Sequence, residues 1–301
     1  MSGPALLSGY AADLALGDPR RWHPVAGFGA AAQRLERLVY APSRARGALF
    51  AGALVAAAAL AAELAGRGRR GPVLAAVTWA ALGGRSLASE AGRIARLVDA
   101  GDLPAARAAL PALVGRDTAE LGEQEICRAV VESVAENTAD AVVGALIWGA
   151  VAGPAGVVAY RSANTLDAMV GRRDDRYEAF GWAAARLDDA LSWPGARGGA
   201  ALAAVAAPAV GGSPRGAWEA VRRDAPAHPS PNAGVIEAAF AGALGVGLGG
   251  PLSYAGRVEA RPALGNGRPP STGDVRRAVR LSLIVGACAA VACAALREAL
   301  A

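Results

Sequence analysis

The stretch Ala141–Tyr160, AVVGALIWGAVAGPAGVVAY, decides the fold class of this 301-residue chain, because its twenty residues include no Asp, Glu or Arg. An α-helix that spans the hydrocarbon core of a bilayer needs about 20 predominantly apolar residues. Gly153 and Pro154 interrupt the stretch and would break a soluble helix, but membrane helix bundles tolerate both residue types. The stretch therefore predicts a helical membrane protein.

Five shorter stretches without Asp, Glu or Arg accompany it. They are Ala238–Gly256 with 19 residues, Gly198–Pro214 with 17, Gly47–Ala62 and Leu281–Leu296 with 16 each, and Gly71–Gly84 with 14. About 17 residues is the lower limit for a span, so only the two or three longest stretches qualify directly. The others span only if a flanking arginine snorkels, or they pack as short helices inside a bundle.

The spacing of apolar residues is helical throughout, and the strict alternation that indicates strands is missing. We therefore expect the all-α class: a polytopic integral membrane helical bundle, one domain over residues 1–301, whose polar helical loops carry the site. Polar inserts are expected at about 85–140 and 161–197, a Gly- and Pro-rich loop at 257–273, and a C-terminal helix at about 274–298. The first seventeen residues lack the features of a signal peptide and predict a mature helix.

The composition agrees with a membrane location and limits the chemistry. Mean hydropathy is +0.29, which is high for a soluble chain, although much of it comes from alanine. All 31 basic residues are arginine. The absence of lysine excludes a pyridoxal-phosphate Schiff base and a Walker-type phosphate loop, so arginine, backbone N–H groups or a metal must hold any phosphate. We expect the three cysteines, Cys127, Cys288 and Cys293, to be small core residues.

A helix is expected after Gly115–Thr118, with Asp117 as its N-cap and Glu120 completing a capping box. Charged residues at steps of four then lie on one face of that helix: Arg128, Glu132, Glu136 and Asp140. One interpretation is a solvated face with Arg128 paired to Glu132. The other is a Mg²⁺ site at the membrane edge, because Mg²⁺ binds through one or two carboxylates plus substrate phosphates.

A second polar cluster follows the longest apolar stretch. Arg161, Asn164 and Asp167 share a helix face, unless Arg161 is only a membrane-edge anchor. Further on, Asp188 and Asp189 lie within one turn of Arg186, and since consecutive helical residues point apart, at most one of the two faces a given site.

Three further features have structural as well as functional interpretations. His23 and His228 stand in proline-flanked loops, where a histidine is either a hydrogen-bonding structural residue or a proton acceptor. Gly245–Gly250 fits the dinucleotide-binding fingerprint, but it has no preceding strand, so we expect its glycines to allow close helix packing.

Eight short motifs occur in one order over residues 9 to about 256. They are Gly17-Asp18-Pro19 with His23-Pro24-Val25; Val114 to Thr118; Glu132 through Ala135-Glu136-Asn137 to Asp140; Asn164 to Asp167 with Met169-Val170-Gly171; Phe180-Gly181; Ala185 to Asp189; Ser230 to Gly234; and Leu248-Gly249-Gly250 with Tyr254, Ala255 and Gly256. Together they resemble the adenosylcobinamide-phosphate synthase family of cobalamin biosynthesis. The chain departs from the family's pattern at Ser192–Arg197, where an Asn is usual, although Arg197 still matches.

The resemblance implies a multi-pass enzyme of the inner (cytoplasmic) membrane that joins adenosylcobyric acid to (R)-1-amino-2-propanol or its O-phosphate, consuming ATP and Mg²⁺. It implies four kinds of partner, namely the corrinoid substrate, the amine, membrane lipid and other corrinoid-pathway membrane enzymes, and no nucleic acid. For that reaction the candidate catalytic residues are Glu132, Glu136, Asp167, Asp188 and His23. The candidate metal ligands are Glu136, Asp140 and Asp189. The candidate substrate-binding residues are Arg116, Asp117, Arg128, Asn137, Arg161, Asn164, Arg186, His228 and Asn232.

The competing hypothesis is a membrane protein without enzymatic activity, either a small-molecule transporter or a scaffold for corrinoid-pathway enzymes. A transporter is expected to place ionisable residues within its spanning helices, as Glu63 and Glu237 would be. Most carboxylates instead gather in loops and at the edges of apolar stretches, which favours an enzyme.

Overall fold

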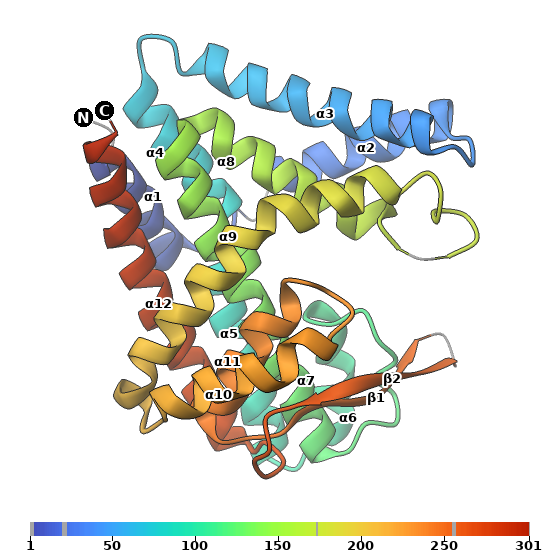
Figure 1. Ribbon diagram of the computed structural model, residues 1–301, viewed down its shortest axis with the longest axis vertical. Helices are drawn as coiled ribbons and strands as arrows, with labels where there is room; N and C mark the ends of the chain where they lie inside the picture. The colour runs from blue at the N-terminus through green and yellow to red at the C-terminus, as the bar shows by residue number, and fades with distance from the viewer. Residues whose placement is uncertain (1–2, 20–22, 173, 255–256, 301) are drawn as a thin grey trace. The chain divides into compact units, whose positions relative to one another are not determined.

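A computed structural model describes residues 3–19, 23–172, 174–254 and 257–300. The structure is 77% helical, and its described residues form one two-stranded sheet, which confirms the all-α class (Figure 1). Ala255 and Gly256 of the last sequence motif lie outside the described residues. The chain groups into two compact units: unit 1 is Met1–Gly83, Asp140–Gly195 and Ala289–Ala301, and unit 2 is Gly84–Ala139 and Ala196–Cys288. The expectation of a single domain stays a prediction.

Unit 1 is built from helices that pack around an apolar core. They are α1 (Gly3–Leu16), α2 (Pro24–Val39), α3 (Arg44–Ala65), α4 (Arg70–Ala81), α8 (Gly144–Val170), the first part of α9 (Trp182–Ala206) and the last part of α12 (Thr272–Ala299). Phe50, Leu166 and Phe180 lie in one buried cluster between α3, α8 and the start of α9. The ends of the chain meet here, because the Gly3 N–H donates to Glu298 Oε1 at 2.6 Å (Figure 1).

Helix α8 is a hairpin of two helical arms rather than one straight rod. Gly153 breaks it with φ 66° and ψ −145°, and Pro154 starts the second arm. A Cβ built on Gly149 would lie 2.9 Å from Val157 Cγ2, whereas residues eight apart in a straight helix are about 12 Å apart along the axis. A Cβ on Gly144 would collide with the Tyr160 hydroxyl, sixteen residues on. The stretch Ala141–Tyr160, expected as one helix, therefore folds back on itself.

Among the described residues, three helical segments are long and apolar enough to cross a membrane: Arg44–Ala65, Glu123–Val170 and Thr272–Ala299. Their most apolar windows are 17%, 67% and 44% buried within the protein, respectively. α3 therefore presents most of its surface outward, as a lipid-facing helix does, while the α8 hairpin is largely enclosed by protein.

Unit 2 holds the remaining helices and the sheet. They are α5 (Gly84–Asp99), α6 (Leu103–Ala109), η1 (Leu110–Ala112), α7 (Glu123–Asn137), η3 (Ala207–Val210), α10 (Pro214–Asp224), η4 (Ala225–Ala227), α11 (Ala233–Leu244), β1 (Leu248–Tyr254) and β2 (Arg257–Leu264), with parts of α9 and α12. The π-helix η2 (Thr138–Val143) connects α7 to α8.

The β1–β2 hairpin corrects the expectation that Ala238–Gly256 is one apolar helical stretch and that 257–273 is all loop. α11 ends at Leu244 because Gly245 adopts a left-handed conformation, φ 72°, as its C-cap. Gly249 and Gly250 also have positive φ, 76° and 91°, at a bulge of the antiparallel pair. These glycines shape a turn and a bulge, and the expectation that they pack helices was wrong.

The start of α7 also differs from the sequence-based expectation. The helix begins at Glu123, and Glu125 accepts a hydrogen bond from the N-cap Gly122 N–H at 2.8 Å. Asp117 and Glu120 are exposed in the preceding loop, so the capping box expected between them was wrong. A Glu marks the third position of a helix only when a residue suited to the N-cap stands three positions before it. Here Gly122 is that N-cap residue and Glu125 is the Glu.

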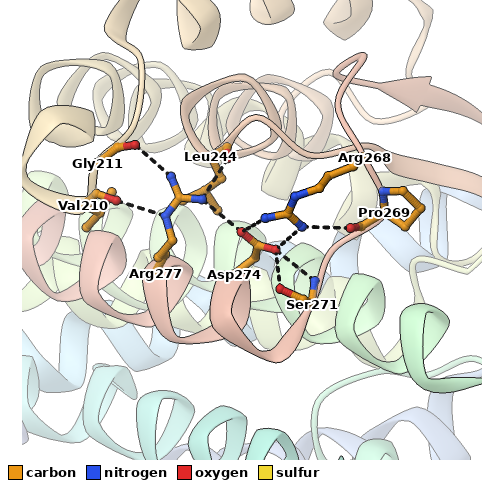
Figure 2. Close-up of polar contacts among 8 residues, drawn as sticks. All are labelled: Val210, Gly211, Leu244, Arg268, Pro269, Ser271, Asp274 and Arg277. Atoms are coloured by element: carbon orange, nitrogen blue, oxygen red, sulfur yellow. Dashed lines mark hydrogen bonds and ion pairs between the residues drawn. The ribbon is translucent and has the colours of Figure 1, made fainter.

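A buried charged network fixes the start of α12 (Figure 2). Asp274, 1% exposed, accepts hydrogen bonds from Arg268, from Arg277 and from the backbone and hydroxyl of Ser271, at 2.6 to 3.1 Å. Arg277 also donates to the carbonyls of Val210, Gly211 and Leu244. The network ties the first turn of α12 to the C-terminal ends of η3 and α11, where carbonyls lack helical partners.

Two of the three cysteines are core residues as expected, Cys127 and Cys293, but Cys288 is exposed. Cys288 and Cys293 are five residues apart in α12 and therefore point to different faces of the helix.

Candidate functional site

In unit 1 a chain of polar side chains links the second arm of α8 to α9. The Arg161 guanidinium donates to Asn164 Oδ1 at 3.0 Å, and the Asn164 amide donates to Asp188 Oδ1 at 3.3 Å. Ser192, one turn further along α9, donates to the same Asp188 oxygen at 3.3 Å. The i, i+3 spacing of Arg161 and Asn164 thus forms the shared face that the sequence predicts.

Tyr160 connects this chain to Asp140. Its hydroxyl donates to the Asp140 carbonyl at 2.9 Å and lies 3.4 Å from Ser192 Oγ. Because α8 folds back, Tyr160 on its second arm reaches Asp140, which lies in η2 just before the first arm. We call Asp140, Tyr160, Arg161, Asn164, Asp188 and Ser192 the Asp188 cluster.

Burial raises the pKa of the Asp188 carboxyl, and the hydrogen bonds from Asn164 and Ser192 only partly oppose that shift. Its neighbour Asp189 points elsewhere and pairs with exposed Arg186 at 3.3 Å. The adjacent carboxylates therefore separate as predicted, and Asp188 is the one that enters the cluster. Asp167 lies one turn before the end of α8, where its backbone carbonyl caps Gly171 at 2.7 Å.

In unit 2 Glu132 of α7 holds the β hairpin. Its Oε2 accepts from Arg116 at 2.8 Å, and its Oε1 accepts from the Gly249 N–H at 2.7 Å. Both side chains of the ion pair are nearly buried, 5% exposed for Arg116 and 12% for Glu132. The suggested pairing of Glu132 with Arg128 was wrong, because a partner sixteen residues away takes the carboxylate. The catalytic role expected of Glu132 stays a prediction.

Arg128 lies against the same hairpin with few partners of its own. Its ion pair with exposed Glu125 is long, 4.0 Å, and its Nε has no hydrogen-bond partner among the described residues. A Cβ built on Gly250 would lie 3.0 Å from Arg128 Nη1, so the guanidinium packs closely against this glycine.

Glu136 and Asn137 end the regular α-helical part of the charged face. Glu136 is exposed, and Asn137 donates to the Ser133 carbonyl at 2.9 Å. The face that the sequence predicts extends to Glu136, and Asp140 follows in the π-helix, which has a different register. Such single π turns inside helices are frequent at functional sites.

Glu237 projects from the apolar helix α11 and is 8% exposed. Burial raises the pKa of its carboxyl, and the nearby charges of Glu136 and Glu132 raise it further, while Arg261 and Arg116 oppose the shift. Glu237 is therefore a carboxyl that favours its neutral form in the company of two glutamates.

The loop before α11 is fixed by hydrogen bonds. Arg197 donates to Asn232 Oδ1 at 2.6 Å and to the Pro231 carbonyl at 2.9 Å. His228 Nδ1 accepts from the Ser230 N–H at 3.1 Å, and burial lowers the pKa of its imidazole. His228 and Asn232 thus both have structural partners within this loop.

His23 has a structural role as well. It is the N-cap of α2, and its Nδ1 accepts from the Val25 N–H at 3.2 Å. The hydrogen-bonding interpretation of both histidines therefore has direct geometric support, and their role in proton transfer stays a prediction.

The metal candidates divide between the two units. Glu136 belongs to unit 2, whereas Asp140, Asp167, Asp188 and Asp189 belong to unit 1. Within the described ranges, no group of three or more His, Cys, Asp or Glu side chains is arranged to hold a metal ion. A Mg²⁺ that arrives with ATP needs only one or two protein carboxylates, and the Asp188 cluster offers Asp140 and Asp188 for that purpose.

Sequence reasoning did not place Tyr160, Ser192, Arg197 or Arg261 in a site. Tyr160 ends the longest apolar stretch directly before Arg161, and a buried tyrosine there needs a partner for its hydroxyl, which is the signal that could have found it. Arg197 appeared only as a match to the family pattern. No sequence signal marks Ser192 or Arg261, because their neighbours in the site come from other helices and strands and are brought close only when the chain folds.

Comparison with known proteins gives a consistent result. The profile of the family described as CobD/Cbib protein matches residues 6–282. The chain is 54% identical to "Cobalamin biosynthesis protein CobD" of Mycobacterium tuberculosis (strain ATCC 25618 / H37Rv) over 290 residues, 95% of this chain and 93% of that protein. It is 45% identical to the protein of the same name from Chromobacterium violaceum over 280 residues, 89% and 88% of the two chains. No solved structure matches the chain. With nearly its whole length matched, the chain belongs to the CobD/Cbib protein family of cobalamin biosynthesis.

Proposed function

We propose that this protein forms the amide bond between adenosylcobyric acid and (R)-1-amino-2-propanol or its O-phosphate, with hydrolysis of ATP, in the cytoplasmic membrane. Its role in cobalamin biosynthesis follows from its family, and the three apolar helical segments support a multi-pass membrane protein. The observation that supports the chemistry best is the Asp188 cluster, in which an arginine and a carboxylate with a raised pKa are joined through one asparagine.

The reaction balances in two steps. A carboxylate oxygen of the corrinoid attacks the γ-phosphorus of ATP, which forms an acyl phosphate and releases ADP. The amine nitrogen then attacks the acyl carbon, the C–O bond breaks, and inorganic phosphate leaves with that oxygen. The proton lost by the amine goes to a base on the protein.

The Asp188 cluster offers the groups for both steps. Arg161 Nε has no hydrogen-bond partner among the described residues, so its guanidinium retains donors for an anionic substrate. A carboxylate with a raised pKa accepts a proton more readily than an ordinary one, which suits Asp188 to the amine proton. Mg²⁺, when bound with ATP at Asp140, would neutralise phosphate charge and leave Asp188 as the proton acceptor. Because the chain contains no lysine, arginine is the side chain that can bind the phosphate groups by charge.

Conversion of adenosylcobyric acid by the purified protein tests the proposal. With ATP, Mg²⁺ and either amine, mass spectrometry is expected to find adenosylcobinamide or its phosphate. Asp188→Asn and Arg161→Gln should each lower kcat/KM at least about 100-fold, since each removes a charged group from the reacting atoms. Arg215→Gln, on the exposed face of α10, is the matched control and should retain wild-type turnover. Absence of product with both amines, from folded wild-type protein, would contradict the proposal.

A transporter or scaffold is the second candidate, favoured by Glu237, a buried carboxyl in an apolar helix. The same assay separates the two hypotheses, because neither a transporter nor a scaffold forms the amide in detergent solution without other proteins.

A further inference from the structure

The bulge at Gly249–Gly250 lies outside the Asp188 cluster, and its conformation requires glycine at both positions. Both glycines have positive φ, and a Cβ at Gly249 would collide with the Pro262 carbonyl. The Gly249 N–H is held by Glu132, which Arg116 in turn holds. Helix α7 therefore fixes the bulge in place through a nearly buried ion pair.

Two further arginines flank the bulge. Arg128 Nη1 lies against Gly250, and Arg261 stands directly across the hairpin from Gly250 in the strand register. Arg261 and Arg116 both act electrostatically on Glu237 of α11, which places the Arg261 charge on the side of the hairpin that faces the helices. Arginines from α7, from β2 and from the loop before α7 thus lie around one pair of glycines.

In the part of the chain that the structure describes, neither Glu132 nor Glu237 forms an ion pair with Arg128. Glu132 is already paired with Arg116, and Glu237 favours its neutral form. Arg128 is left with Glu125 at 4.0 Å, although its side chain is only 18% exposed and its Nε has no partner among the described residues. A guanidinium that is mostly removed from water and has an unsatisfied Nε is costly, so the surroundings of Arg128 favour an anion with several oxygens.

We propose that Arg128, Arg261 and the Gly249–Gly250 bulge bind a phosphoryl group of a substrate. Glycine without a side chain lets the phosphate oxygens approach the backbone, and the planar guanidinium groups grip them bidentately. The site lies in unit 2, apart in sequence from the Asp188 cluster. The inference rests on the proposed function for its two phosphate-bearing ligands, the triphosphate of ATP and the phosphate ester of aminopropanol.

Calorimetric titration of the purified full-length protein in detergent tests the site. The probes are a non-hydrolysable ATP analogue with Mg²⁺ and 1-amino-2-propanol O-phosphate, each added alone. Arg128→Gln and Arg261→Gln should weaken binding of one probe about 10- to 100-fold, because a charge-assisted hydrogen bond contributes on that order. The probe that is affected identifies the source of the phosphate. Arg215→Gln, an exposed arginine in the same unit, should bind both probes as the wild type does.

Two further variants separate binding from folding. Arg128→Lys keeps the charge but loses the planar guanidinium that binds two oxygens at once, and should show an intermediate loss of affinity. Gly250→Ala keeps every charge but adds a Cβ that contacts Arg128, and should weaken binding of the same probe. Only variants whose unfolding temperature equals that of the wild type are compared. The proposal is overturned if folded Arg128→Gln and Arg261→Gln proteins bind both probes with wild-type affinity, or if the wild type binds neither.

The outcomes distinguish this site from the proposed function. Binding through these arginines by a protein that forms no amide would contradict the function alone. Amide formation by the two variants with unchanged KM for ATP and for aminopropanol phosphate would contradict the site alone.

Discussion

At the scale of single residues, helical spacing predicted which residues share a face, but it did not always predict which partner a residue takes, as Arg128 and Glu132 show. Arg161 and Asn164 interact as their separation of three predicts, and Asp188 and Asp189 point apart as neighbours must. Partners from distant segments were not predictable. Glu132 contacts a residue sixteen positions before it and another 117 positions after it, and no pattern in the sequence relates those three.

The raised pKa of Asp188 predicts how its charge affects stability. Because the folded protein holds the Asp188 proton more tightly than the unfolded chain does, stability falls as pH rises from the ordinary carboxyl range through the raised value. Asp188→Asn keeps an oxygen for the Asn164 amide and removes the titration. The variant should therefore lose less stability than the wild type over that pH rise.

Thermal unfolding in detergent, measured across the acidic to neutral range, checks this expectation. Glu219→Gln, at an exposed position of α10, serves as the control and should follow the wild-type curve. A wild type and an Asp188→Asn variant with parallel curves would show that burial does not perturb this carboxyl.

At the scale of elements, helices were predictable and their interruptions were not. The sequence marks Gly153-Pro154 as a weak point, but whether a helix kinks there or folds back depends on what packs against both arms. The β hairpin was missed for a related reason: its strands contain glycine and proline in place of alternating apolar residues, and α7 fixes it through Glu132.

Gly153→Ala should destabilise the protein by about 1–3 kcal/mol, because φ 66° with ψ −145° is a conformation that essentially only glycine adopts. Gly52→Ala is the matched control, since Gly52 lies in helix α3 with open space around it, and should be neutral or stabilising. Equal unfolding temperatures for Gly153→Ala and the wild type would argue that α8 does not fold back at this residue.

Asp274→Asn should cost about 3 kcal/mol of stability, because it leaves Arg268 and Arg277 without their buried carboxylate and weakens the cap of α12 (Figure 2). The estimate takes the low end of the usual range since Arg268 is 57% exposed. Glu219→Gln removes an exposed ion pair with Arg215 and should cost less than about 1 kcal/mol. Chemical unfolding of the three proteins gives the comparison, and an equal loss in both variants would remove the special role of the Asp274 network.

At the scale of the whole molecule, the apolar composition is distributed unevenly. α3 faces outward along most of its length, whereas the α8 hairpin is largely covered by protein. The sequence predicted the membrane character of the chain but ranked Ala141–Tyr160 as its best span. In the structure α3 is the least buried of the three candidate helices. The length of an apolar stretch could not predict this, because it does not depend on which other helices pack against it.

Ala56→Arg tests that assignment, because it places a charge on an exposed position near the centre of α3. An arginine at the centre of a spanning helix costs about 2.5–3.5 kcal/mol of insertion free energy. The variant should show a reduced membrane-integrated fraction after carbonate extraction, and Ala56→Leu should not. Full integration of Ala56→Arg would place α3 outside the hydrocarbon core.

The central claim, activation of a corrinoid carboxylate by ATP, is tested most directly by following an oxygen atom. Adenosylcobyric acid labelled with ¹⁸O in its free carboxylate is incubated with the purified protein, ATP, Mg²⁺ and the amine, and the released phosphate is analysed by mass spectrometry. An acyl phosphate intermediate predicts one ¹⁸O transferred to inorganic phosphate for each amide formed. Amide formation with unlabelled phosphate, or with the label in AMP, would contradict it.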